Sequence, residues 1–197
     1  MKKLDFDFNP RKFIQALVFF SKNGVSDLTK MKVAKLLFLA DKLHLVRYGR
    51  PITGDDYFAM QYGPVPSGAK NFLDAAEETM VSVGPDETAG LFDGYVKMVP
   101  TSYLPVITAT GPDDFRVFSR SERKILDEVL KKFGGLTAAK LSDLTHKDRA
   151  YVIPNNTRPE FGRAEMPYEL FFEGQDKSML AVAEAEQEHR DMVGALS

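Results

Sequence analysis

Apolar side chains recur every three to four positions through the first fifty residues, which is the spacing of an α-helix. The first such segment begins at Pro10, a residue that suits the first helical position. It is followed by Gly24, and glycine commonly ends helices. We therefore expect a helix over residues 10–22.

The second segment is apolar around most of its circumference. It begins near Asp27 or Thr29, either of which can cap a helix, and it extends to Tyr48, where Gly49 supplies a stop. A helix without a polar face is covered on all sides in a folded protein. The pattern predicts that this helix is the buried centre of the fold.

Turn-forming residues then separate short aromatic and β-branched segments, which favour strands. Residues 57–62 predict a short strand, and the Gly-Pro-Val-Pro sequence at 63–66 is expected to end it. Residues 95–99 and 103–109 predict two more strands, which prolines interrupt. Because proline confines a strand to an edge or a bulge, the sheet should be small and peripheral.

Helix-capping signals mark the rest of the chain. Ser119 and Glu122 have the spacing of a capping box, which predicts a helix from there to Gly134. Other helices should begin at Ser67, Thr137, Pro167 and Asp176, with an irregular stretch at 154–159. The predicted fold is mainly α: a compact single domain over residues 1–197, with about six to seven helices around a buried central helix, a small peripheral antiparallel β-sheet, and a C-terminal helical extension over about residues 165–195.

The composition is that of a globular protein, with 44% hydrophobic and 27% charged residues. The chain has no cysteine, which excludes disulfides, thiolate metal ligands and a cysteine nucleophile and fits a reducing compartment. Its apolar runs are shorter than the ~20 residues of a membrane span, and its first residues lead into Asp5 and Asp7 instead of an apolar export signal. We expect a cytoplasmic protein without a membrane partner.

Charge is distributed unevenly along the chain. Residues 1–50 contain 11 basic and 4 acidic side chains, whereas residues 151–197 contain 4 basic and 9 acidic ones. The net charge of −2 gives the whole chain no field that attracts nucleic acid, so we expect no nucleic-acid partner. The basic region can pair with the chain's own acidic C-terminal region, solvate helix faces or, in a DNA-binding regulator, contact phosphate.

No complete catalytic or metal-binding motif is present in the sequence, such as a Gly-rich phosphate loop or paired histidines on a helix. A metal-dependent hydrolase would have to use Asp41 and His44 on the central helix together with Asp55 and Asp56 in the following turn. We favour structural roles for them, as a satisfied polar pair and as turn or helix-start residues. The prediction is an absence of catalytic residues, metal and cofactor.

Two stretches of the sequence resemble the Panacea antitoxin domain, also called the SocA-like antitoxin domain and associated with the phage protein GepA. The first covers residues 35–67 and contains Met-Gln-Tyr-Gly-Pro-Val-Pro-Ser at its end; the second covers residues 119–130 and a helix end with Ser142 and His146. From these two stretches we expect the family domain to cover about residues 10–150. Where the family has a tryptophan shortly after His146, this chain has Tyr151.

The resemblance implies an antitoxin of a bacterial or phage toxin–antitoxin system, which neutralises a co-encoded protein toxin by direct binding. In one branch of the family it suggests instead a proteolytic adaptor that delivers the toxin to a ClpX-type protease. Both are binding functions, so the chain is predicted not to be an enzyme. A DNA-binding regulator and a metal-dependent hydrolase are the alternatives from other classes.

The segment around the Gly-Pro turn is the predicted partner-binding surface, because tyrosine and methionine combine rigid and adaptable apolar area. The same side chains can equally belong to the core, since strand alternation sends successive residues to opposite faces. The histidine at the helix end can contact a partner or interact with the carbonyl end of its own helix. The candidate residues are Tyr57, Met60, Tyr62, Gly63, Pro64, Val65 and His146.

Overall fold

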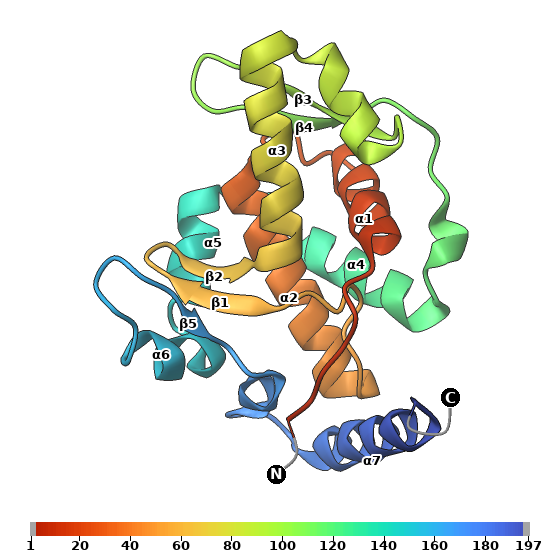
Figure 1. The fold of residues 1–197 in the computed structure, drawn as a ribbon, viewed down its shortest axis with the longest axis vertical. Coiled ribbons are helices and arrows are strands. Elements are labelled where there is room, and N and C mark those ends of the chain that lie inside the picture. The colour runs from red at the N-terminus through yellow and green to blue at the C-terminus, as the bar shows by residue number, and fades with distance from the viewer. Residues whose placement is uncertain (1–2, 195–197) are drawn as a thin grey trace.

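The computed structural model describes residues 3–194 (Figure 1). Within that range the α-helices are α1 (Pro10–Lys22), α2 (Lys30–Tyr48), α3 (Ser67–Val83), α4 (Arg120–Phe133), α5 (Ala138–Thr145), α6 (Arg149–Asn155) and α7 (Ser178–Gly194). The strands are β1 (Tyr57–Met60), β2 (Gly63–Pro66), β3 (Val96–Val99), β4 (Val106–Ala109) and β5 (Ala164–Glu165), and the 3-10 helices are η1 (Asp86–Phe92), η2 (Phe115–Val117) and η3 (Tyr168–Phe172). The prediction of a mainly helical fold with a small amount of antiparallel sheet is confirmed.

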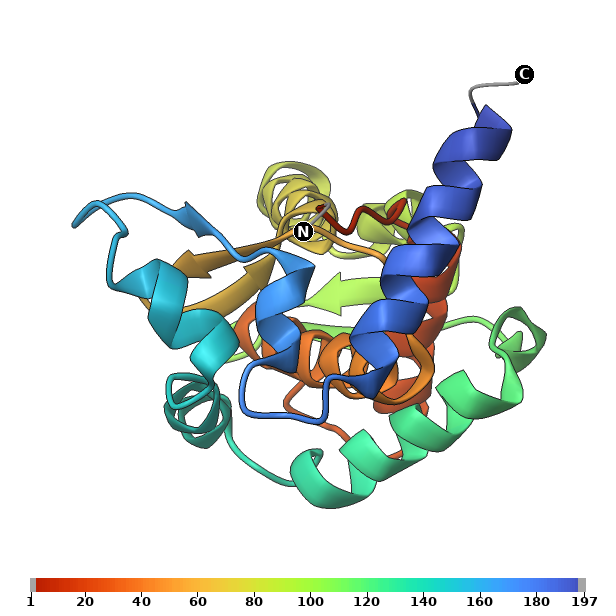
Figure 2. The ribbon, with the colours of Figure 1, turned by 90° about the horizontal axis from the view of Figure 1, so that it is seen from below.

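Helix α2 lies at the centre of the molecule (Figure 2). It begins after Thr29, whose side chain caps it, and ends at Gly49, which adopts a left-handed conformation with φ of 76°. Along its length it packs against α4, α5 and β2, and also against α3, η3 and α7. Its apolar side chains are buried on every side, so the predicted central helix is confirmed.

The strands form two separate antiparallel sheets, one with the order β2-β1-β5 and one with β3-β4. The segment predicted to end the first strand is itself strand β2, and Pro64 and Pro66 lie opposite Ala59 and Tyr57 of β1. Proline is tolerated there because β2 is at the edge of its sheet, where the missing N–H interrupts no ladder. The first strand ends before residue 63 as predicted, but the prediction missed that residues 63–66 form a strand of their own.

Two further local predictions are corrected. Ser67 does not cap α3; the carboxylate of Asp55 does so, accepting hydrogen bonds from the backbone N–H groups of Gly68 and Ala69 at 2.7 Å each. The irregular stretch predicted at residues 154–159 begins later, because α6 contains Pro154 in its last turn and is capped at its start by Asp148. The capping box before α4 is confirmed.

Helix α7 crosses the end of α2, and its last described turns project from the body (Figure 2). It buries Leu180 and Ala183, and its N-terminal turn packs beside Gly49. The predicted C-terminal extension thus contains η3 and α7, while residue 195 at its predicted end lies outside the described residues. Among the described helices, none has the length and apolar content that crossing a membrane requires.

Candidate functional site

Strands β1 and β2 form a hairpin whose outer side borders a cleft of about 340 Å³, which we call the hairpin cleft. The hairpin, the start of α2 and the start of α3 each supply one wall. The lining is mostly apolar and includes Met31, Ala34, Met60, Tyr62, Val65 and Leu73. A concave apolar surface with a few polar groups is the usual form of a binding site.

The backbone of the hairpin is fixed by three side chains that reach it from three different helices. Tyr151 of α6 donates its hydroxyl toward the carbonyl oxygen of Met60 at 3.0 Å. Ser142 of α5 donates to the carbonyl of Tyr62 at 2.9 Å, and Lys35 of α2 donates to the carbonyl of Pro64 at 2.9 Å. These bonds hold alternate carbonyls of the hairpin, so its tip is a preorganised surface.

The candidate residues predicted from the sequence separate into three groups around this hairpin. Met60, Tyr62 and Val65 line the hairpin cleft, and the Tyr62 side chain is 59% exposed. Gly63 and Pro64 are buried behind them. Tyr57 is only 2% exposed and donates its hydroxyl to Asp41 at 2.8 Å, so it belongs to the core and is not available to a partner.

Gly63 is required at its position by both conformation and space. Its φ of 103° lies in the region that side chains rarely adopt, and an added Cβ would lie 2.9 Å from the Lys35 amine and 3.1 Å from the Thr145 hydroxyl. Glycine at position 63 therefore allows the turn of the hairpin to pack closely against α2 and α5.

His146 lies behind the hairpin, at the end of α5. Its ring packs against Tyr151 with centroids 4.7 Å apart, and its Nε2 is buried without a hydrogen-bond partner within the described residues. Burial lowers its pKa, and the nearby Lys35 charge lowers it further, whereas the backbone of Gln61 acts in the opposite direction. His146 therefore supports the hairpin from behind, and Tyr151 occupies the position where the family was expected to have tryptophan.

Lys35 is the most unusual residue of the site, because it is 1% exposed and no carboxylate within residues 3–194 pairs with it. Burial lowers its pKa to about 7. The signal for this burial was present in the sequence, since Lys35 lies within an apolar run on a helix without a polar face. It was missed because lysine is usually exposed.

Charged side chains border the outer end of the hairpin cleft. Lys30 contacts Asp74 at 2.6 Å and also pairs with Glu77, while Lys70 pairs with Asp74 across one turn of α3. A partner that covers the apolar cleft would meet this ion-pair network at its edge, which is the arrangement of protein–protein interfaces.

The polar residues of the central helix have structural roles. Asp41 is buried and accepts hydrogen bonds from the N–H groups of Ile52 and Thr53 at 2.8 Å each, as well as from Tyr57. His44 uses its two ring nitrogens on the Arg50 carbonyl and the Ser121 hydroxyl, at 2.6 and 3.0 Å. No hydrogen bond joins Asp41 to His44, so the expected pair does not form, but each residue has its own hydrogen-bond partners in the surrounding structure.

Asp55 and Asp56, in the turn that follows α2, do not form a shared site with Asp41 and His44 either. Asp55 caps α3, burial raises its pKa to about 6, and Asp56 is exposed at the surface. Among residues 3–194, no three His, Asp or Glu side chains gather where they could hold a metal ion. Asp41 and His44 thus bind the turn that follows α2, and Asp55 caps α3.

The basic N-terminal region is largely neutralised by ion pairs. Each described Lys and Arg between residues 3 and 50, with the exception of Lys35, pairs with a carboxylate. All but one of the acidic partners lie outside the C-terminal acidic segment, in residues 27–148. Among the described residues, the expected pairing with the acidic C-terminal region is therefore found only for Lys3, and the other carboxylates reduce the net positive charge that a DNA-binding regulator would present in this region.

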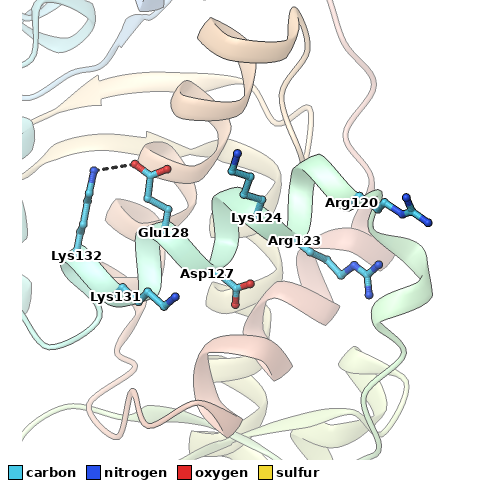
Figure 3. A pocket seen from close by; sticks show the side chains of 7 residues that line it. All are labelled: Arg120, Arg123, Lys124, Asp127, Glu128, Lys131 and Lys132. Carbon is cyan, nitrogen blue, oxygen red and sulfur yellow. Dashed lines mark hydrogen bonds and ion pairs between the residues drawn. The ribbon is translucent and has the colours of Figure 1, made fainter.

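A separate basic surface lies on the outward face of α4 (Figure 3). The side chains there are Arg120, Arg123, Lys124, Asp127, Glu128, Lys131 and Lys132, and they line a shallow hollow. Glu128 pairs with Lys132 at 2.7 Å, and most of the others point outward into solvent. Since α4 makes no substantial contact with the hairpin, this face is independent of the hairpin cleft.

Both the hairpin and α4 lie in a part of the chain that a known protein family shares. The family model described as the SocA-like antitoxin, Panacea domain, matches residues 33–151. The chain belongs to this family. The Panacea domain therefore contains most of α2, the whole β1–β2 hairpin and the three side chains that hold it, together with α4 and α5. No curated protein and no solved structure matches the chain.

Proposed function

We propose that this Panacea-domain protein is the antitoxin of a bacterial or phage toxin–antitoxin system and neutralises a co-encoded toxin by direct protein–protein binding. The observation that carries the proposal is the family match over residues 33–151. Members of an antitoxin family have a toxin as their partner. We propose in addition that neutralisation takes place in the cytoplasm by direct binding and without catalysis by the antitoxin itself.

The hairpin cleft is the surface that fits this function best. Met60 and Tyr62 present adaptable and rigid apolar area beside an ion-pair network, and three hydrogen bonds from neighbouring helices hold the hairpin that carries them. A preorganised surface loses little conformational entropy when a partner binds. A standard interface of ~800 Å² per partner would extend from the cleft over the hairpin tip.

The proposal is tested by titrating the purified product of the neighbouring toxin gene with this protein. We expect inhibition of the toxin at near-equal molar amounts, through a complex that survives gel filtration. Tyr62→Asp should weaken the complex at least tenfold, because it places a charge on the exposed side of the hairpin cleft. The control Arg123→Ala on α4 should bind like the wild type.

Two results would contradict the proposal. A toxin that stays fully active in the presence of excess antitoxin, but is degraded once a ClpX-type protease is added, would favour the adaptor function. A complex weakened by Arg123→Ala and unaffected by Tyr62→Asp would move the interface from the hairpin cleft to α4.

A further inference from the structure

The loop between α6 and β5 presents a phenyl ring to solvent. Phe161 is 96% exposed, and its loop, residues 156–163, projects from the molecule in Figure 2. A single exposed apolar side chain is common on protein surfaces and by itself indicates nothing. The way in which this loop is built and placed is the reason to consider Phe161 further.

The guanidinium of Arg158 organises the loop from inside. Its Nη1 lies 2.9 to 3.1 Å from the carbonyl oxygens of Pro159, Glu160 and Gly162, the residues on either side of Phe161. Its Nε donates to the Asn155 side chain at 3.0 Å. Fixed carbonyls on both sides of Phe161 define the direction in which its ring leaves the loop.

The same network connects the loop to the hairpin. The Tyr151 hydroxyl lies 3.1 Å from the Asn155 side-chain oxygen and 3.0 Å from the Met60 carbonyl. Strand β5 pairs with β1 so that Ala164 lies opposite Ala59, and the residues before β5 therefore continue beside the end of β1. Figure 1 shows the loop and the hairpin turn on the same side of the molecule. The loop that carries the exposed Phe161 is thus hydrogen-bonded, through Asn155 and Tyr151, to the hairpin that carries the exposed Tyr62.

The charged side chains near Phe161 indicate what kind of partner surface its ring would contact. Arg163 stacks over the Phe58 ring at 4.2 Å from its centroid and forms no ion pair with any described residue. Arg158 donates to carbonyl oxygens and pairs with no carboxylate within residues 3–194. Two cations flank the loop against the one carboxylate of Glu160, and a partner with acidic side chains beside an apolar pocket would complement this edge.

We propose that Phe161 is an anchor that inserts into an apolar pocket of the toxin, a pocket with acidic residues at its rim that face Arg163. This inference rests on the proposed function and extends its interface from the hairpin cleft to the loop. An aromatic side chain has two rotatable bonds and loses little entropy when it is buried, and the Arg158 network has already ordered its backbone. Aromatic residues of this kind contribute most of the binding energy in many interfaces.

The experiment measures the dissociation constant for the purified product of the neighbouring toxin gene. Phe161→Ala should raise it at least tenfold, which corresponds to about 1.4 kcal/mol at 25 °C. Tyr103→Ala is the matched control, because Tyr103 is 87% exposed on the turn between β3 and β4, and it should change the constant less than twofold. Arg163→Glu should weaken binding as well, with a smaller effect at high salt.

Thermal unfolding of both alanine variants should match the wild type, since each ring is almost entirely outside the core. If the wild-type protein binds the toxin and Phe161→Ala binds it equally well, this inference is overturned and the proposed function stays intact. Failure of the wild-type protein to bind would overturn both. A change in oligomeric state of Phe161→Ala with unaltered toxin binding would show that the ring contacts a second copy of this chain, which also overturns the inference.

Discussion

Replacement of Lys35 by methionine should stabilise the folded protein at neutral and acidic pH. The amine is 1% exposed, donates to the Pro64 carbonyl at 2.9 Å and has a pKa of about 7, whereas an exposed lysine has one of 10.5. Below pH 7 the side chain is protonated in the folded and in the unfolded chain, so the folded state carries the full cost of a buried charge. Methionine of similar length fills the same space without that charge.

The size of the effect follows from the two pKa values. Between pH 7 and 10.5 the unfolded chain binds one proton more than the folded one, so wild-type stability rises with pH by up to about 1.4 kcal/mol per unit. The full difference between the unfolded and folded pKa values corresponds to about 5 kcal/mol. Loss of the hydrogen bond to Pro64 offsets about 1 kcal/mol of this gain. The expected gain of Lys35→Met at pH 6 is therefore on the order of 4 kcal/mol, and it should shrink as the pH approaches 10.

Urea denaturation at several pH values between 6 and 9.5 measures this difference directly. Subtracting the wild-type free energy of unfolding from that of Lys35→Met removes the contribution of titrating groups that do not interact with Lys35. His146, whose pKa the Lys35 charge lowers, still contributes to the difference. Lys124→Met, on the exposed face of α4, is the control and should give a flat difference. Parallel stability curves for wild type and Lys35→Met would refute the reasoning, because they would mean that Lys35 titrates alike in the folded and unfolded chain.

Three further substitutions test the packing around α2, each by urea denaturation. Asp41→Ala leaves buried donors without an acceptor, the Tyr57 hydroxyl among them, and should lower the free energy of unfolding by about 3 to 5 kcal/mol; a loss below 1 kcal/mol would contradict its role. Leu37→Asp places a charge in the core and should unfold the protein, so an unchanged transition would show that α2 is exposed. Glu122→Ala removes the buried partner of Lys12 and should cost about 2 kcal/mol, whereas a neutral result would show that the ion pair is dispensable.

Local signals in the sequence predicted the helices well where a capping residue and an apolar pattern agreed. The helix from Pro10 to Lys22, the stop at Gly49 and the capping box at Ser119 were all found as expected. Predictions failed where tertiary structure overrides a local rule. Two prolines were taken as the end of a strand, but they are tolerated in β2 because its edge is unpaired.

The candidate site was only partly predictable for a related reason. Strand alternation could separate Tyr57 from Met60 and Tyr62, but it could not tell which face is covered, and that is decided by the packing of β1 over α2 and η3. Nothing in the sequence pattern marked Phe161 as a candidate partner-binding residue. Its exposure depends on hydrogen bonds from Arg158 to three carbonyls in a loop, and no periodic pattern announces such a network.

Growth of cells that express the product of the neighbouring toxin gene, with and without this protein, tests the central claim most directly when it is measured in a strain without ClpX. Neutralisation by binding predicts that growth is restored while the amount of toxin in the cell stays the same. Tyr62→Asp should lose this protection and Tyr103→Ala should retain it. Growth that stays arrested in the strain without ClpX, with wild-type antitoxin abundant, would contradict neutralisation by binding.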